Sequence, residues 1–427
     1  MKRRDFMKIA GGAGLATVLP GIIMPQQALA AGPFNGPILL TIFAGGGWDH
    51  SSFSDPRNNT SINHWARNKS AGTEGNLSYA PMGENAEFFR KYANDMLVFN
   101  GLNLRSGGHK GASRAQSTGA LSGLPMSNAL YAAIKGKELP LPWLLSRTDR
   151  HTEGIQPFTP LPSTKDLQRL VSDNKRDDKS VYFRNTDMDI INRYRLDRIQ
   201  ALQAEQSNLP YTNRKLEEMY KARKNGNLLS NLAKSSFVMD TVDLKGQNHR
   251  LIEPLNRILL ASQAGLSATS SIRTTHNYDS HRNHDQNHEA GLTHLTRALD
   301  YVWEKATAMG IESRLVVHVN SDVGRRPSYN GKNGKDHSSI GSSFIMMKNQ
   351  SWTGRVVGMS GPQHQAVKIN PISLQEDPNG IYLTTAHVHH TLREILGIEN
   401  ESLSKRFSLN GPSLGLLSSN ASSPVKA

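Results

Sequence analysis

The sequence contains no cysteine. This absence excludes disulfide bonds, iron–sulfur clusters, thiolate zinc sites and a cysteine nucleophile. Any bound metal ion must therefore be held by histidine, aspartate, glutamate or other oxygen donors. A chain without thiols also suits export to an oxidising compartment, because no cysteines can pair wrongly there.

Long hydrophobic runs are also absent after the N-terminal segment. No stretch of about 18 apolar residues follows residue 30, so we expect no membrane-spanning helix in the mature chain. Acidic residues are outnumbered: 50 Lys and Arg against 36 Asp and Glu give a formal net charge of +14. This balance favours anionic small-molecule or polymer partners. The basic residues are scattered rather than interleaved with aromatics, which disfavours nucleic acid as a partner.

The first 30 residues are typical of an export signal. They combine a basic start, a weakly apolar centre rich in Gly and Ala, and a small-residue cleavage site at 28–30. The pair Arg3 and Arg4 favours the twin-arginine pathway over an ordinary secretory signal or an uncleaved anchor. We therefore expect residues 1–30 to be a signal peptide that directs the chain, through the twin-arginine translocase, to the periplasm or the exterior.

Predicted strands and helices alternate along the mature chain. Short apolar runs predict the strands, and apolar residues at helical spacing predict the helices. The expected strands cover 38–43, 96–100, 313–322 and 342–347, and the expected helices cover 84–93, much of 193–265, 293–310 and 384–398. This alternation indicates a layered α/β fold, with one domain over 31–415 and a helical insertion at about 190–265. The Ser/Asn/Pro-rich segment 416–427 is expected to be a disordered tail.

Polar clusters follow several of the predicted strands. They are Trp48-Asp49-His50, the loop around His109, Ser321-Asp322 and Gly334-Lys335-Asp336-His337. Open α/β sheets bind their ligands at the carboxyl ends of the strands. The clusters therefore predict a functional site at that edge of the sheet.

The segment THNYDSHRNHDQNH (275–288) holds the densest group of metal-binding residue types. Asp279 and His281 are separated by one residue on this segment, a spacing that suits the binding of one ion. The expected metal ligands are Asp49, Asp279, His281, Asp322 and His337, with His284 and His288 as alternates. Plainer explanations are a histidine-rich surface loop and, for an Asp after a strand, a turn or cap. Arg325 and Arg326 are either a solvated pair or an anion clamp.

Three segments resemble an exported bacterial family. The runs YDSHRNHDQ (278–286), SDVGRRPSYNGKNGKDHSS (321–339) and TTAHVHHTLREILGI (384–398), with the arginine-pair leader, resemble domain-of-unknown-function family 1501. The resemblance covers essentially all of the mature chain. It implies the fold of the alkaline phosphatase and sulfatase superfamily, a three-layer α/β sandwich with a central, mostly parallel sheet. Members of that superfamily are metal-dependent hydrolases of phosphate and sulfate esters.

The resemblance also implies where a metal would bind. The superfamily's ligand positions fall on Asp49, Asp279, His281, Asp322 and His337. In the superfamily Asp322 would be followed by His, whereas Val323 stands here, so a second ion would lose a ligand. The resemblance therefore implies one complete site for a divalent metal (zinc, manganese, calcium or magnesium) and one incomplete site.

The nucleophile is marked less clearly than the metal ligands. The run GGHKGASRAQSTG (107–119) resembles the sulfatase nucleophile motif, but it lacks cysteine and its spacing from Arg to Thr-Gly is one residue shorter. The hydroxyls that could serve as nucleophile are those of Ser51, Ser113, Ser117 and Thr118. His109 takes the nucleophile's place in the motif, as a ligand or a covalent acceptor. Arg114 and Arg325 are expected to neutralise the leaving charge.

Two functions are compatible with these features. The first is a periplasmic metal-dependent hydrolase of anionic phosphate or sulfate esters, which is favoured by four retained residues: Asp279, His281, Asp322 and His337. The second is a non-catalytic envelope protein that keeps a hydrolase-like fold and binds an anionic polymer or a protein partner. Val323 and the unclear nucleophile favour this second function.

Overall fold

The computed structural model describes residues 34–161 except 138 and 140, residues 180–205 and 249–417, and the single positions 174, 209, 212 and 216. The signal peptide expected at 1–30 lies outside these residues, as do much of the insertion expected at 190–265 and most of the expected tail. The domain boundaries expected from the sequence therefore stay predictions.

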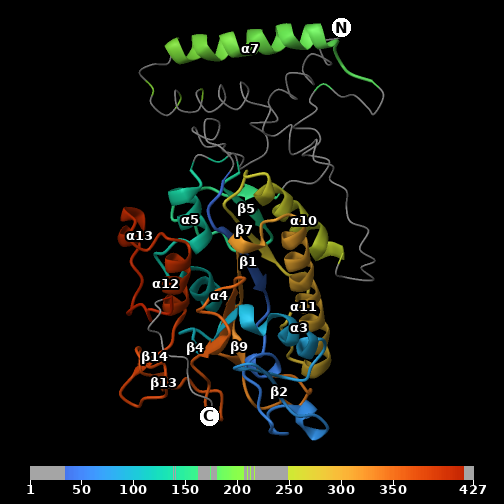
Figure 1. The fold of residues 1–427 in the computed structure, drawn as a ribbon, viewed down its shortest axis with the longest axis vertical. Helices are drawn as coiled ribbons and strands as arrows, with labels where there is room; N and C mark the ends of the chain where they lie inside the picture. Colours follow the sequence, from blue (N-terminus) through green and yellow to red (C-terminus); the bar gives the residue numbers. More distant parts are fainter. Residues whose placement is uncertain are drawn as a thin grey trace.

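An eight-stranded sheet forms the centre of the fold (Figure 1), in the order β12-β4-β11-β8-β1-β7-β5-β6. Its strands are β1 (Ile38–Ala44), β4 (Met96–Asn103), β5 (Trp143–Ser146), β6 (Thr159–Pro160), β7 (Thr269–Arg273), β8 (Leu315–Ser321), β11 (Ile340–Met346) and β12 (Arg355–Val357). Strand β11 is antiparallel to β4 and β8, and every other neighbouring pair in this sheet is parallel. The expected mostly parallel sheet is therefore confirmed.

The other described elements are helices and short hairpins. The described helices are α3 (Asn85–Tyr92), α4 (His109–Thr118), α5 (Ser127–Lys135), α7 (Asn185–Glu205), α10 (His249–Gln263), α11 (His284–Ala308), α12 (Thr385–Ile395) and α13 (Ser402–Arg406). The hairpins pair β2 (Gly72–Glu74) with β3 (Leu77–Tyr79), β9 (Gly324–Arg325) with β10 (His337–Ser338), and β13 (Lys368–Ile369) with β14 (Ile381–Tyr382).

Two apolar clusters, one on each face of the sheet, make the fold three-layered. Alternate residues of a strand point to opposite faces, and in β1 Leu40 and Ile42 belong to one cluster while Leu39 belongs to the other. Helices α3, α10 and α11 supply residues to the first cluster, and α4, α5 and α12 supply residues to the second. The strand is buried along its whole length because both faces are covered.

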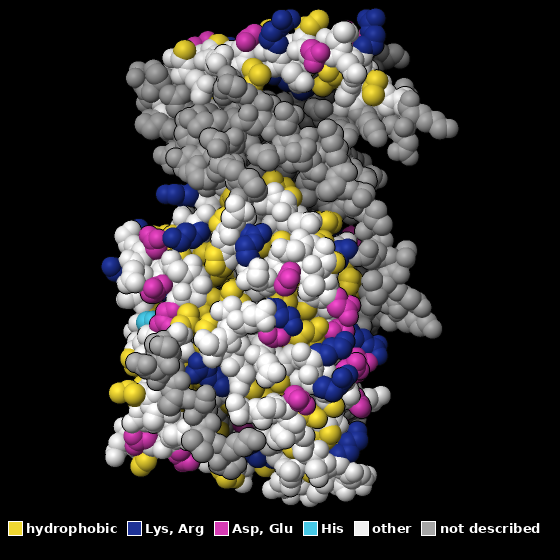
Figure 2. Space-filling view, in the orientation of Figure 1, with side chains coloured by type: hydrophobic (Ala, Val, Ile, Leu, Met, Phe, Trp, Pro, Cys, Tyr) yellow, Lys and Arg dark blue, Asp and Glu magenta, His cyan; other side chains and the backbone are white. Residues whose placement is uncertain are grey.

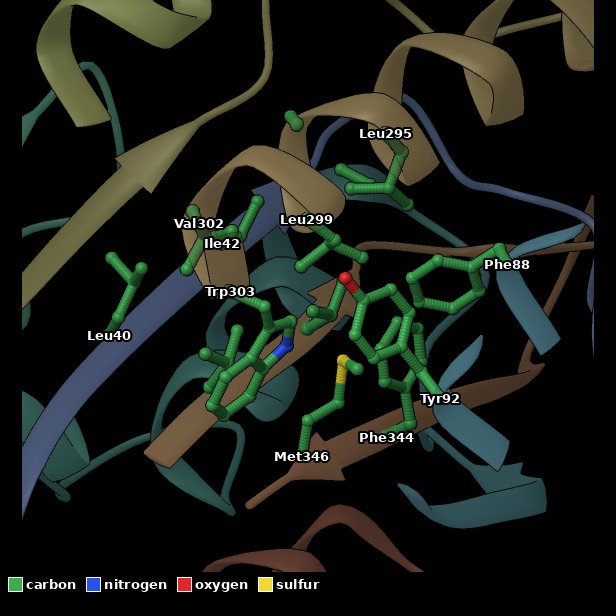
Figure 3. Packing of buried hydrophobic residues seen from close by; sticks show 14 of the residues in the cluster. Leu40, Ile42, Phe88, Tyr92, Leu295, Leu299, Val302, Trp303, Phe344 and Met346 are labelled. Carbon is green, nitrogen blue, oxygen red and sulfur yellow. The ribbon is translucent and has the colours of Figure 1, made fainter. Parts of the chain in front are cut away.

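Figure 3 shows how the first cluster is built. Leu295, Leu299 and Trp303 of α11 face the cluster, with Trp303 the nearest of the three to Leu40 of β1, and α3 adds aromatic rings beside β11. These α11 residues recur at intervals of four, so they share one face of the helix. Burial of this face fixes α11 across the sheet and with it the loop that precedes the helix.

The strands and helices expected in the described part of the chain are present, with one shift. Helix α11 begins at His284 rather than at 293. Its first turns carry His284 and His288, which are buried polar side chains that interrupt the apolar pattern. Asn283 precedes the helix with φ of 47°, a left-handed conformation that Asn tolerates better than most residues. Helical periodicity therefore marks only the part of α11 that packs on the core.

Charged side chains of both signs are interspersed on the face of the molecule shown in Figure 2. Among the described helices, none is both long and apolar enough to cross a lipid bilayer.

The packing of α11 gives a first prediction. Leu299 is fully buried, so Leu299→Ala should lower the free energy of unfolding by about 2–5 kcal/mol through lost apolar contact and a residual cavity. Thr307→Ala, at an exposed position of the same helix, is the matched control and should change it by about 0.5 kcal/mol or less. Urea unfolding followed by circular dichroism measures both. Equal midpoints for the two variants would contradict this account of the core.

Candidate metal centre

Loops from distant parts of the chain meet at the carboxyl ends of β1, β7 and β8. The turn after β1 contains Gly46, whose φ is 110°, and a Cβ there would lie 2.6 Å from the backbone nitrogens of Tyr278 and Asp279. A second close approach is at Gly334, where a Cβ would lie 2.0 Å from the carbonyl oxygen of His281. Only glycine permits these contacts without a shift of the backbone, so the two glycines let the loops pack directly on one another.

Three ligand-type atoms form a small triangle in this region. His281 Nε2 and His337 Nε2 lie 3.0 Å apart, and each lies 3.2 Å from Asp279 Oδ1. His109 Nε2 lies 3.6 Å from Asp279 Oδ2. The side chains of all four residues are partly exposed, between 25% and 45%. We call Asp279, His281, His337 and His109 the exposed centre.

Carboxylates orient two of these histidines from behind. His281 Nδ1 lies 2.9 Å from Asp336 Oδ1, and His109 Nδ1 lies 2.9 Å from Asp322 Oδ2. A histidine that donates from Nδ1 presents a lone pair at Nε2, which is the form that binds metal. The Asp322 carboxylate also accepts hydrogen bonds from the backbone N–H groups of Gly46 and Val323. Asp322, which was expected to be a metal ligand, and Asp336 therefore contact the exposed centre through the Nδ1 atoms of these two histidines.

Arg325 is the cation that holds this region together. Its side chain is fully buried, and it donates to the carbonyl oxygens of Gly46, Gly47, Tyr278 and Lys335 as well as to Asp279 Oδ1 at 2.8 Å. Burial alone would raise the pKa of Asp279, but hydrogen bonds from Arg325 and His337 outweigh burial and lower that pKa to about 2. Because its donors are engaged inside the protein, Arg325 acts on Asp279 rather than reaching towards solvent.

The other expected ligands lie in a separate, buried cluster around Asp49. Lys335 Nζ lies 2.6 Å and His284 Nε2 3.1 Å from Asp49 Oδ2, while His288 Nε2 accepts from the Asp49 backbone N–H at 2.9 Å. Asp49 Oδ1 accepts hydrogen bonds from the N–H and Oγ of Ser51. Burial alone would raise the pKa of Asp49, but Lys335 and His284 outweigh burial and hold it well below its ordinary value. Lys335 thus supplies the positive charge that Asp49 requires.

The hydroxyls named from the sequence bond to groups outside the exposed centre. Ser113 and Ser117 both donate to Asp149, and Thr118 donates to the carbonyl oxygen of Arg114. Arg114 forms an ion pair with Glu153. The Ser51 hydroxyl forms hydrogen bonds with Asp49 and Asn63. Of the candidates on α4, the structure brings His109, at the first position of the helix, to the exposed centre.

Lys335, Asp336, His50 and His364 were not predicted from the sequence as metal ligands or catalytic groups. Asp336 and Lys335 stood in a polar cluster beside His337, so adjacency was a usable signal for them. His364 lies in a turn that no expected strand or helix borders, and no sequence pattern connects it with His50.

Comparisons with known proteins give structural likenesses. No known family profile matches the sequence, and no curated protein matches it. The PsFucS1 sulfatase from Pseudoalteromonas sp. is similar at a TM-score of 0.41 and 10% identity, over 100% of this chain and 78% of the sulfatase. A TAB5 alkaline phosphatase mutant with magnesium bound is similar at a TM-score of 0.33 and 8% identity, over 73% of this chain and 91% of the phosphatase. At these scores the likenesses support no statement about function.

The buried pair of Asp49 and Lys335 makes a testable contribution to stability. Lys335→Met removes one partner and leaves a buried carboxylate without its cation, which should cost about 3–5 kcal/mol of unfolding free energy. Lys332→Met, an exposed position of the same loop, should cost about 0.5 kcal/mol or less. Chemical denaturation compares the two. If Lys335→Met is as stable as Lys332→Met, the pair does not support the fold.

The pairing of Asp279 with Arg325 predicts a pH dependence. An unpaired Asp in the unfolded chain has a pKa of about 3.9. Since the folded-state pKa of Asp279 is lower, at about 2, its pairing stabilises the fold above about pH 4, and this contribution is lost as pH falls through about 2. In chelator-treated protein, Arg325→Lys should raise the pKa of Asp279, because an ammonium replaces the planar guanidinium. Carboxyl carbon NMR measures the shift. Arg326→Lys is the control, and equal pKa values in both variants would contradict the assignment.

Proposed function

We propose that this protein is an exported metal-dependent hydrolase of anionic phosphate or sulfate esters, a member of family 1501 that reaches the periplasm or the exterior by the twin-arginine pathway. The observation that carries the hydrolase proposal is the triangle of Asp279 Oδ1, His281 Nε2 and His337 Nε2, with sides of 3.0–3.2 Å. The export pathway and the family rest on the sequence resemblance.

The donor atoms of the triangle fit a divalent metal ion. Ligands of a tetrahedral zinc ion lie about 2.0–2.1 Å from it, and so roughly 3.3 Å from one another, close to the separations found here. Two imidazole nitrogens and one carboxylate suit zinc best and manganese next, whereas calcium and magnesium prefer oxygen donors. Catalytic zinc sites commonly use three protein ligands and keep one position open. Asp279, His281 and His337 would supply the three.

The residues around the triangle have separate tasks in this proposal. A bound divalent ion would supply Lewis acidity, which polarises an ester oxygen and makes water more acidic. Asp336 holds the imidazole of His281 in its ligating orientation, and Arg325 keeps Asp279 ionised. His109, oriented by Asp322, would serve as the general acid and base, because its Nε2 lies beside the triangle and remains partly exposed.

The surroundings of His109 favour an anionic substrate. His109 is the first residue of α4, where backbone N–H groups lack helical partners and attract anions. The approach to this helix end is open, since a Cβ at Gly107 would meet nothing within 4 Å. Exposed basic residues also neighbour this site in the sequence. Lys110 follows His109, Arg282 follows His281, and Arg326 follows Arg325. Together these features would attract a phosphate or sulfate group.

One observation favours the alternative of a non-catalytic protein that binds an anionic polymer or a protein partner. The hydroxyls of Ser51, Ser113, Ser117 and Thr118 all bond to groups outside the exposed centre. Hydrolysis would therefore use water as the nucleophile, and a protein without such turnover could still bind anions at the same place.

Metal content and hydrolysis together test the proposal. Asp279→Asn/His281→Gln should lose the ion of the exposed centre and all hydrolysis of a panel of phosphomonoesters, phosphodiesters and sulfate esters. His109→Gln should keep the ion but lower kcat by about 10²–10⁴, the usual contribution of a general acid or base. The control Asp187→Asn/His151→Gln changes the same residue types away from the exposed centre and should keep both properties. Elemental analysis by mass spectrometry and initial rates are the measurements.

The outcomes separate the two functions. Loss of ion and turnover in the double variant, with turnover alone lost in His109→Gln, supports the hydrolase. A wild-type protein that binds the ion and sulfated or phosphorylated polymers, yet turns over no ester in the panel, supports the binding protein. A wild-type protein without an ion at the exposed centre overturns the metal-dependent proposal.

A further inference from the structure

A second group of metal-binding side chains lies in the interior, apart from the exposed centre. It consists of Asp49, His50 and His364, of which the first two are fully buried and the third is 2% exposed. One ligand-type atom from each lies within 4.8 Å of the others. The rings of His50 and His364 have centroids 4.4 Å apart. Only Asp49 was expected as a ligand from the sequence.

The hydrogen bonds of the two histidines fix which nitrogen carries the proton. His364 Nδ1 lies 3.1 Å from the carbonyl oxygen of Arg325, and since a carbonyl can only accept, Nδ1 is the donor. His50 Nε2 lies 3.2 Å from Ser360 Oγ, and that hydroxyl gives its own proton to Asp55 Oδ2 at 2.6 Å. Ser360 must therefore accept from His50 Nε2–H. Each histidine, in its neutral form, then presents a lone pair at its other nitrogen.

Those two lone pairs have no hydrogen-bond partner. Within the described part of the chain, His50 Nδ1 and His364 Nε2 are buried nitrogen atoms without a donor in reach. Two lone pairs cannot bond to one another, and buried polar atoms are seldom left unpaired. A proton on either nitrogen would place a positive charge on an imidazole that is almost completely buried, and burial disfavours the charged form.

We propose that His50 Nδ1, His364 Nε2 and the Asp49 carboxylate form a buried site for a divalent transition-metal ion, with zinc as the best fit. Imidazole nitrogens favour zinc, cobalt or nickel over calcium and magnesium. An ion there would satisfy both lone pairs at once and add to the charge that balances Asp49. None of its ligands belongs to the exposed centre, and the proposal does not rest on the hydrolase function proposed above.

The charged groups nearby set the limits of this site. Asp49 already accepts from Lys335 at 2.6 Å, and Asp55 is paired with Arg57 at 2.6 Å. The two carboxylates are thus balanced by two cations before an ion binds. An ion must share Asp49 with Lys335, so Lys335→Met should tighten zinc binding at the site and zinc should restore part of the stability which that variant loses.

The site has a structural task. His50 begins the short 3-10 helix His50–Ser52 after the glycine turn that ends β1, whereas His364 lies in a separate turn and donates to the carbonyl oxygen of Arg325. An ion between the two histidines would tie this turn to the end of β1. Since Arg325 also binds Asp279, the buried site would brace the exposed centre from below without touching a substrate.

The test uses the full chain with the exposed centre removed by Asp279→Asn/His281→Gln. After refolding with excess zinc and dialysis, this protein should retain about one tightly held zinc ion per chain, as structural sites do. Adding His50→Gln and His364→Gln should abolish the retained zinc and lower Tm. Adding His318→Gln instead, at another buried and neutral histidine, should leave the zinc in place. Replacement of zinc by cobalt gives an absorption spectrum that reports imidazole coordination.

Three results would overturn the proposal. They are no retained zinc in the Asp279→Asn/His281→Gln protein, retention that survives loss of both His50 and His364, and a wild-type crystal grown with zinc in which a water alone lies between the two rings. An anomalous peak between the rings at the zinc edge would support it, even where the quadruple variant fails to fold. Because the exposed centre is absent from the tested protein, failure of the hydrolase proposal leaves this result unaffected.

Discussion

The buried guanidinium of Arg325 is the interaction on which the arrangement of the site depends. It binds carbonyl oxygens from the turn after β1, from the segment after β7 and from the loop that carries Lys335, and it also binds Asp279. These segments come from three separate parts of the chain, and the guanidinium contacts all of them. A planar cation with five donors can satisfy several carbonyl oxygens together. It also keeps Asp279 ionised beside His281 and His337.

Ionisable side chains are arranged at two depths beneath the same strand ends. Near the surface, Asp279 and three histidines remain open to solvent. Below them, Asp49 is paired with Lys335, and the histidines around it are neutral because burial opposes their protonation. A buried carboxylate needs a compensating charge. In the interior Lys335 supplies it to Asp49, whereas at the surface the candidate metal ion would supply it to Asp279. The same residue types therefore do different work at the two depths.

Much of the fold could be predicted from the sequence, but a smaller part of the candidate site could be. Local periodicity was sufficient for β1, β4, β8 and β11 and for the core-facing part of α11, since apolar spacing is a local property. The resemblance placed Asp279, His281 and His337 in one group, and the structure brings these three side chains together. The roles of Lys335 and His364 could not be predicted, because their partners come from segments hundreds of residues away.

The strand that organises the fold is paired with parts of the chain that are made much later. In β1, Leu39 pairs with Thr269 and Ile38 pairs with Leu315, so the strand has no partner until most of the protein has left the ribosome. Such high contact order predicts slow folding and a long interval with an unpaired apolar strand. A chaperone that shields this strand would protect the nascent chain from aggregation. A shortened chain that ends before β8 could form neither the β1–β8 pair nor either group of candidate metal ligands.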